Sequence, residues 1–348
     1  FLISNHAYSP QGYNNVYKDH NLYYNNLMSK KKGKTPIQPV SGTKVPRFAG
    51  ASTFARLPEL RDVESCDVAI VGVPFDAGTS YRPGARFGPQ SIRQASRHLR
   101  TNYHPAYDAE PFLEQQVADA GDITCNPFNI NESVEQIQKA ATDLLGRVGG
   151  IISMGGDHTI ALPLLRAINK KNNGPVALVH FDAHLDTWDT YFGAPYTHGT
   201  PFRRAREEKL FLDDSSMHVG IRGPLYSRDD LKNDAEFGFK IIHCDEFQTE
   251  GIDKIVKRIR DRVKNNPLYL SIDVDVLDPS QAPGTGTPEV AGMTTREMVN
   301  VLRGLSGLNL VSADVVEVSP AYDHAEITSL AAATIVYELT NLFAKRKA

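Results

Sequence analysis

The segment Val176-Ala177-Leu178-Val179-His180-Phe181 is an apolar run that passes directly into Asp182-Ala183-His184-Leu185-Asp186. The run is short and almost continuous in hydrophobicity, which is typical of a strand buried on both faces of a parallel sheet. Side chains on an extended segment alternate between two sides, so Asp182, His184 and Asp186 are expected to share one side. Because an unpaired buried carboxylate is costly, the sequence favours a cation at the end of this strand.

Similar apolar runs recur from Asp67 onward, and amphipathic stretches lie between them. We predict strands at 68–73, 150–154, 176–181, 217–221, 239–242, 268–272 and 310–316, and helices at 89–100, 133–147, 159–171, 252–265, 294–305 and 326–344. This alternation predicts an α/β fold, a single three-layer α/β/α domain with a mostly parallel central sheet.

The first 47 residues differ from the rest, because they are polar, rich in tyrosine and weakly periodic. We interpret 1–47 as an arm that lies on its own domain or on a neighbouring subunit, with a loose tail as the alternative. Residues 48–348 are then predicted to form the single α/β domain.

Composition excludes several classes of protein. The formal net charge of the 348 residues is -3 and there is no long basic stripe, so nucleic-acid binding is not expected. No apolar run approaches the ~20 residues that span a bilayer, so no membrane partner is expected. The three cysteines are far apart and form no CxxC motif, which fits a cytoplasmic protein. The chain begins with Phe1, and the mitochondrial matrix is the alternative compartment if a presequence was removed.

Two further clusters follow apolar runs: Gly155-Gly156-Asp157-His158, and Ser271 to Pro279 with the core Asp273-Val274-Asp275. Ligands of open α/β sheets bind beyond the carboxyl ends of the strands. Glycines let the backbone turn sharply, which would aim His158 at that region. Asp273 and Asp275 share a side, and their mutual repulsion calls for a cation.

The three clusters together supply two histidines and four aspartates. Carboxylates shared by two ions are what a dinuclear centre requires, with metals about 3.5–4 Å apart. Oxygen and imidazole ligands favour manganese, with nickel, cobalt or iron as alternatives, and the lack of thiolates argues against structural zinc.

In this order and spacing, the motifs at 155–158, 182–186 and 271–279 resemble those of the ureohydrolase family, which includes arginase and agmatinase. The resemblance runs from about Phe48 to the C-terminus. It implies an arginase-like fold and hydrolysis of a guanidino compound to urea and an amine. Leu185 departs from the family, since many relatives carry Thr there, but it faces away from its neighbouring ligands.

The resemblance also implies roles for single residues. One ion would be held by His158, Asp182, Asp186 and Asp273, and the other by Asp182, His184, Asp273 and Asp275. His180 has the same parity, but the family does not use it as a ligand, and we interpret it as a buried hydrogen-bonding histidine. The remaining histidines outside the motifs, His218 among them, are interpreted as structural.

The predicted catalytic residues are His198, Glu317 and Asp186. His198, in Thr197-His198-Gly199, matches the proton-shuttle histidine of the family, and a histidine suits that task because its pKa lies near the working pH. Glu317 follows the last predicted strand and is expected to pair with the planar guanidinium.

The loops at 78–89, 186–198, 284–289 and 321–330 resemble those of the agmatinase and guanidinobutyrase branch. Agmatine is the predicted substrate, and the charged residues near the pocket give conflicting indications. Asp189 would attract an amine tail such as that of agmatine. Arg82 or Arg204 would instead attract a carboxylate, so a guanidino acid such as 4-guanidinobutyrate, or guanidine itself, is the alternative. Trp188 and Tyr191 either wall the aliphatic chain or pack beneath the loop.

Two other classes stay open. An inactive regulatory subunit of a mixed oligomer should lack ligands, whereas this chain keeps all six. A metal amide hydrolase of the deacetylase type would use one metal and different loops. The resemblance further implies a homo-trimer or homo-hexamer.

Overall fold

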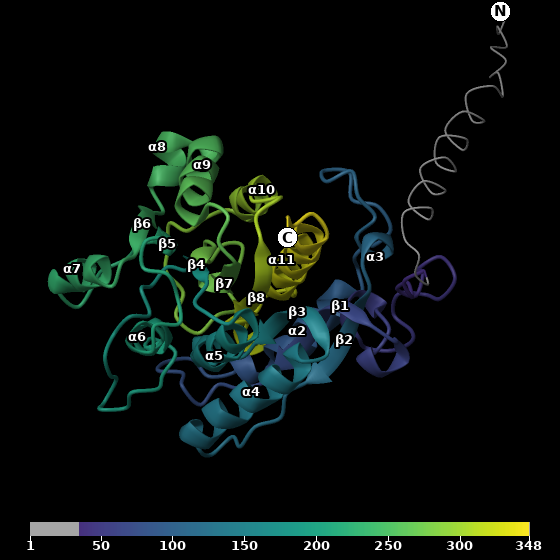
Figure 1. Ribbon diagram of the computed structural model, residues 1–348, viewed down its shortest axis with the longest axis horizontal. Coiled ribbons are helices and arrows are strands. Elements are labelled where there is room, and N and C mark those ends of the chain that lie inside the picture. The colour runs from purple at the N-terminus through teal and green to yellow at the C-terminus, as the bar shows by residue number, and fades with distance from the viewer. Residues whose placement is uncertain (1–34, 348) are drawn as a thin grey trace, which may run out of the picture. The chain divides into compact units, whose positions relative to one another are not determined.

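The computed structural model describes residues 35–347, so most of the predicted N-terminal arm lies outside the described residues. Eight strands form one sheet in the order β2-β1-β3-β8-β7-β4-β5-β6, and every neighbouring pair is parallel (Figure 1). The strands are β1 (Cys66–Val73), β2 (Val117–Asp122), β3 (Val148–Gly155), β4 (Ala177–Phe181), β5 (Met217–Ile221), β6 (Lys240–His243), β7 (Leu268–Asp273) and β8 (Leu310–Val316).

Helices cover both faces of this sheet, and the side chains of β1 show the layering. Val68 and Ile70 belong to one apolar cluster, whereas Ala69 and Val71 belong to another. The first cluster includes side chains of α2 (Gly88–Ser96), α9 (Ile252–Val263), α10 (Thr295–Gly304) and α11 (Ile327–Ala344), and the second includes those of α4 (Ile130–Leu145), α5 (Ala161–Asn172) and α6 (Pro201–Glu207). The predicted three-layer α/β/α architecture is confirmed.

All seven predicted strands are present, and the prediction missed β2, α6 and the shorter helices α3 (Pro111–Glu114), α7 (Asp229–Glu236) and α8 (Glu246–Glu250). β2 reads Val-Ala-Asp-Ala-Gly-Asp, which lacks the hydrophobicity of the other strands. It lies at the edge of the sheet, where Arg93 pairs with Asp119 at 2.8 Å and with Asp122 at 2.6 Å. A long-range ion-pair network therefore stabilises a strand that local sequence does not signal.

The closing helix α11 is long and apolar enough to cross a membrane by length and composition alone, which the sequence analysis did not anticipate. In the folded chain 72% of this helix is buried. Its residues Ala332, Val336 and Leu339 belong to the apolar cluster that also contains side chains of β8. Burial in the core accounts for the apolar character of α11.

Four neighbouring strands in the middle of the sheet, β3, β8, β7 and β4, precede the segments that carry the predicted site. His158 follows β3, Glu317 follows β8, Asp273 ends β7, and Asp182 follows β4. Since parallel strands end at the same edge of a sheet, these side chains come from four distant stretches of sequence to one place.

Candidate metal centre

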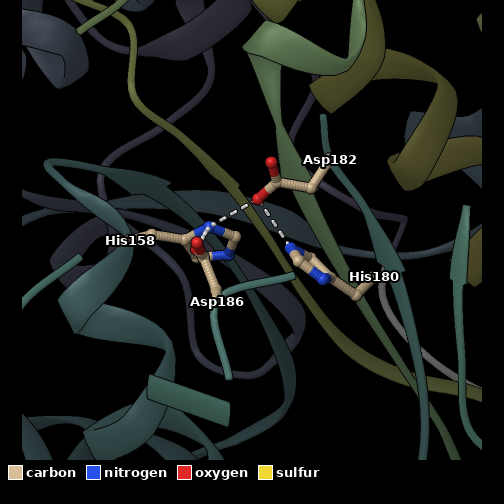
Figure 2. Close-up of side chains that lie close together, drawn as sticks. All are labelled: His158, His180, Asp182 and Asp186. Carbon is tan, nitrogen blue, oxygen red and sulfur yellow. Dashed lines mark hydrogen bonds and ion pairs between the residues drawn. The ribbon is translucent and has the colours of Figure 1, made fainter. Parts of the chain in front are cut away.

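His158 stands at the centre of the first group of potential ligands. Its Nδ1 atom lies 2.9 Å from Oδ2 of Asp186, 3.2 Å from Oδ2 of Asp182 and 3.5 Å from Oδ2 of Asp273. Figure 2 shows the imidazole of His158 and the carboxylates of Asp182 and Asp186 pointing toward one another. The preceding turn requires Gly156, because a Cβ atom there would lie 2.0 Å from the carbonyl oxygen of Phe75.

The other nitrogen of His158 is held from behind. Nε2 lies 2.9 Å from Oγ of Ser271, and Ser271 donates a hydrogen bond of 2.7 Å to Oδ1 of the buried Asp314. Such outer contacts fix the orientation of a ligating imidazole. The unused Nδ1 is therefore directed toward the carboxylates.

The second group is built around His184. Its Nδ1 atom lies 3.1 Å from Oδ2 of Asp275 and 3.2 Å from Oδ1 of Asp182. Asp182 thus faces His158 with one oxygen and His184 with the other. Five of the six predicted ligands fall into two groups that share Asp182. The sixth, Asp273, lies beside the first group, with its Oδ2 atom 3.5 Å from Nδ1 of His158.

The charges of this cluster are unbalanced in the protein alone. Burial, followed by the nearby charges of Asp275 and Asp182, raises the pKa of Asp273 well above its usual value. Burial and the charge of Asp182 raise the pKa of Asp275 to about 6. His158 Nδ1 is buried and has no hydrogen-bond partner among the described residues, although three carboxylates surround it. A cation between these groups would satisfy the nitrogen and the carboxylates together.

His180 makes the buried hydrogen bonds that were predicted for it. Figure 2 shows the ring of His180 facing the carboxylate of Asp182, and Nε2 lies 2.7 Å from Oδ2 of Asp182. Nδ1 lies 2.7 Å from Nδ1 of His218. Nε2 of His218 in turn lies 3.2 Å from Oδ1 of Asp234. Protein atoms engage both nitrogens of His180, which favours a supporting role over ligation, although its ligand atom also lies within the first group.

His218 was interpreted as a structural histidine, and Asp234 was not among the predicted site residues. The one available signal was register, since His218 in β5 pairs directly with His180 in β4. Asp234 lies in α7, 16 residues further along the chain, and has no local signature.

Glu317 and His198 lie beside the metal-ligand groups. Oε1 of Glu317 accepts a hydrogen bond of 2.9 Å from the backbone N–H of His158 and lies 3.2 Å from Nδ1 of His198. Burial alone would lower the pKa of His198, but the Glu317 carboxylate outweighs it and raises the pKa to about 9. Glu317 and Asp186 both adopt positive φ values, 65° and 55°, which are uncommon outside glycine and concentrate at functional sites.

A pocket of about 570 Å³ opens onto this cluster. Its lining includes three predicted metal ligands and the predicted proton donor, namely His184, Asp186, Asp273 and His198. It also includes Trp188, Tyr191, Arg82 and Glu289. Trp188 and Tyr191 contact each other edge to face, with ring centroids 5.9 Å apart. The two aromatic side chains therefore do wall the pocket, in addition to packing against each other.

Two of the three charged residues that were expected to select the substrate tail, Asp189 and Arg204, pair with each other instead. Asp189 pairs with Arg204 at 2.5 Å, and neither side chain lines the pocket. Arg82 does line it, with its guanidinium 5.4 Å from the ring centroid of Tyr81 and 5.1 Å from that of Tyr322.

Comparison with known proteins assigns the chain to a family. Residues 66–341 match the Arginase family. The chain belongs to the arginase family. It is 46% identical to "Putative agmatinase 1" of Schizosaccharomyces pombe, over 86% of this chain and 83% of that protein. It is 45% identical to the guanidinopropionase of Pseudomonas aeruginosa, over 89% and 97% respectively.

Solved structures of the arginase family agree with this assignment. Proclavaminate amidinohydrolase from Streptomyces clavuligerus superimposes with a TM-score of 0.82 at 41% identity, covering 86% of this chain and 99% of that one. The chain is therefore an enzyme, a ureohydrolase that acts on a guanidino compound and depends on metal. Relatives that are named for different substrates lie at similar identity, so family membership alone does not select the substrate.

Proposed function

We propose that this ureohydrolase uses two divalent cations, with manganese as first choice and nickel as second, to hydrolyse agmatine to putrescine and urea. The observation that carries the proposal is the convergence of two His/Asp groups, His198 and Glu317 on one pocket. Nδ1 of His158 has no hydrogen-bond partner among the described residues and faces three carboxylates, which is the arrangement expected of a metal ligand.

We assign one cation to His158, Asp182, Asp186 and Asp273, and the other to Asp182, His184, Asp273 and Asp275. When bound, such a pair of cations supplies Lewis acidity and lowers the pKa of a water molecule toward neutrality. The chain's own residues bind and orient the substrate and move its protons.

Glu317 binds the guanidinium group. Its Oε1 atom is engaged by His158 and His198, whereas Oε2 is buried without a hydrogen-bond partner in residues 35–347. A planar guanidinium donates to carboxylates in a fixed geometry, and so Oε2 orients the carbon to be attacked. His198, protonated below about pH 9, donates a proton to the leaving amine.

Glu289 binds the amine tail of agmatine. It lines the pocket, and its only charged partner among the described residues is His184, with Nε2 3.9 Å from Oε1. Trp188 and Tyr191 cover the aliphatic chain between the two charged ends.

A guanidino acid is the second candidate substrate, and Arg82 is the observation that favours it. This guanidinium lines the pocket, and no carboxylate of residues 35–347 lies within salt-bridge distance of it. A tail carboxylate such as that of 4-guanidinobutyrate could pair with it.

A urea-release screen decides between these tails. The enzyme is loaded with manganese or nickel and given agmatine, 4-guanidinobutyrate, 3-guanidinopropionate, arginine and guanidine. We expect the highest kcat/KM with agmatine, and Glu289→Gln should raise its KM about 10-fold through loss of a charged hydrogen bond. Asp189→Asn, the same change at the acid paired with Arg204, should have no effect. Faster turnover of a guanidino acid would overturn the choice of agmatine.

The proposal also covers assembly and compartment. We propose a homo-trimer or homo-hexamer, measurable by light scattering of the purified enzyme. We propose a cytoplasmic location, with the mitochondrial matrix as the alternative, which cell fractionation distinguishes.

A further inference from the structure

Ser80 contacts the free edge of the His198 imidazole. Its Oγ atom lies 2.7 Å from Nε2 of His198, and its backbone nitrogen lies 3.2 Å from the same atom. Nδ1 of that imidazole faces Glu317, so the ring is held on both sides. Ser80 also lines the pocket, in the loop between β1 and the short 3-10 helix Ala85–Phe87.

The loop that carries Ser80 is tied to the other motifs of the site. The N–H of Gly78 donates a hydrogen bond of 2.7 Å to Oδ2 of Asp157, and its carbonyl accepts one of 3.0 Å from the N–H of His198. A Cβ atom at position 78 would lie 2.1 Å from Oγ1 of Thr159, so only glycine permits this approach. The hydrogen bond between the backbones of Gly78 and His198 thus holds the loop of Ser80 beside His198, and the bond to Asp157 ties the same loop to the segment that follows β3.

The two groups of Ser80 that face Nε2 differ in what they can do. A backbone N–H can only donate, and so it favours the neutral imidazole with a lone pair on Nε2. A hydroxyl can donate to that lone pair or accept from Nε2–H. Only the hydroxyl of Ser80 can therefore hold the protonated ring.

We propose that Ser80 is a positioning residue for His198, whose hydroxyl holds Nε2 in both protonation states while Glu317 holds Nδ1. The inference rests on the proposed role of His198 as proton donor. As the C–N bond of the substrate breaks, its electron pair returns to the amine nitrogen, which takes the proton from Nε2. The Ser80 hydroxyl then turns and donates to the emptied Nε2.

The test compares Ser80→Ala with the wild type in the metal-loaded enzyme across pH. General-acid catalysis contributes roughly 10²–10⁴-fold to the rate of a reaction. If the His198 ring is no longer held in orientation, kcat should fall roughly 10- to 100-fold with little change in KM. The alkaline limb of the kcat profile should move to lower pH, because the backbone N–H that remains favours the neutral ring. The charged groups around His198, namely Glu317, Asp186 and Asp157, are unchanged in this variant.

Three comparisons make the result specific to His198. Ser80→Thr keeps the hydroxyl and should restore both kcat and the alkaline limb. In the His198→Gln background, Ser80→Ala should cost nothing further. Ser91→Ala removes a half-buried hydroxyl of α2 that contacts Ser329, and it should behave as wild type.

A Ser80→Ala enzyme with wild-type kcat and an unmoved alkaline limb would overturn the inference, and so would an equal loss with and without His198. Nitrogen NMR of the imidazole gives a readout that does not depend on turnover, with a lower pKa of His198 expected in Ser80→Ala. If the wild type releases no urea in the screen, the proposed function fails. The NMR titration then still decides whether Ser80 holds His198.

Discussion

Glu317 accepts a hydrogen bond of 2.9 Å from the backbone N–H of His158, so the residue that would orient the substrate is fastened to a predicted metal ligand. The left-handed backbone of Glu317, with φ at 65°, turns the side chain back toward β3. Its free Oε2 atom would lie 3.3 Å from a Cβ atom built on Gly286, so any side chain at 286 would crowd the guanidinium site. Glu317 and the predicted metal ligand His158 therefore belong to one connected unit, which would hold substrate and cations together.

Replacing Glu317 with Gln should abolish most of the activity while leaving the metals bound. The amide can no longer offer a full negative charge to the guanidinium, and a charged hydrogen bond is worth about 1.5–3 kcal/mol. We expect kcat/KM to fall at least about 10- to 100-fold, with metal content unchanged by mass spectrometry. Glu236→Gln, on the exposed face of α7, is the control and should match the wild type. Wild-type kcat/KM in Glu317→Gln would contradict its role.

Removing Asp273 should empty the centre. It faces His158 and is repelled by Asp182 and Asp275, and a bound cation would offset this repulsion. We expect Asp273→Ala to lose both bound metal after gel filtration and urea release, by at least about 100-fold, since even outer-shell changes cost 10–100-fold. Asp143→Ala, at an exposed acid of α4, tests the effect of losing one aspartate elsewhere. Full activity in Asp273→Ala would refute the ligand assignment.

The rate should fall on the alkaline side near pH 9. Burial alone would lower the pKa of His198, but Glu317 raises it to about 9. The protonated ring is the donor, so the donor is fully present well below pH 9 and disappears as pH rises through that value. A kcat profile from pH 6 to 11 measures the limb, and His198→Gln should remove it. A limb that persists unchanged in His198→Gln would assign the proton to another group.

A methyl group at position 78 should disturb both folding and catalysis. The Cβ of Gly78→Ala would overlap Thr159, and overpacking of this kind costs about 1–3 kcal/mol. The loop must move, which takes Ser80 away from His198, so kcat should fall along with the denaturation midpoint. Gly174→Ala meets no atom within 4 Å and is the matched control. An unchanged denaturation midpoint and kcat in Gly78→Ala would show that the loop accommodates a Cβ atom at position 78, contrary to this prediction.

The sequence predicted which side chains gather at the centre because the His/Asp clusters follow the ends of strands, yet one step of the reasoning was too simple. Strict alternation was expected to place Asp182, His184 and Asp186 on one side. β4 already ends at Phe181, and Asp186 adopts a left-handed conformation with φ at 55°. Asp186 reaches the centre through a turn of the backbone, and not through the parity of a strand.

Other features were invisible because their partners are distant in the chain. Asp189 was interpreted as a free acid near the pocket, but it forms an ion pair with Arg204, which lies 15 residues later in the chain. Asp234 offers no local motif, and its contacts with His218 and with Thr187, the neighbour of Asp186, join it to the centre. Periodicity reports which face is buried, whereas such pairings depend on how helices and loops return to the sheet.

The placement of the centre over β3, β8, β7 and β4 has a consequence for how the enzyme tolerates damage. β2 and β6 are the outermost strands, and we expect them to open before the four strands that precede the centre. Partial opening at either edge would then leave the predicted ligands in place. Loss of the ions should instead accompany unfolding of the four central strands, so we expect heat to inactivate the enzyme abruptly and not gradually.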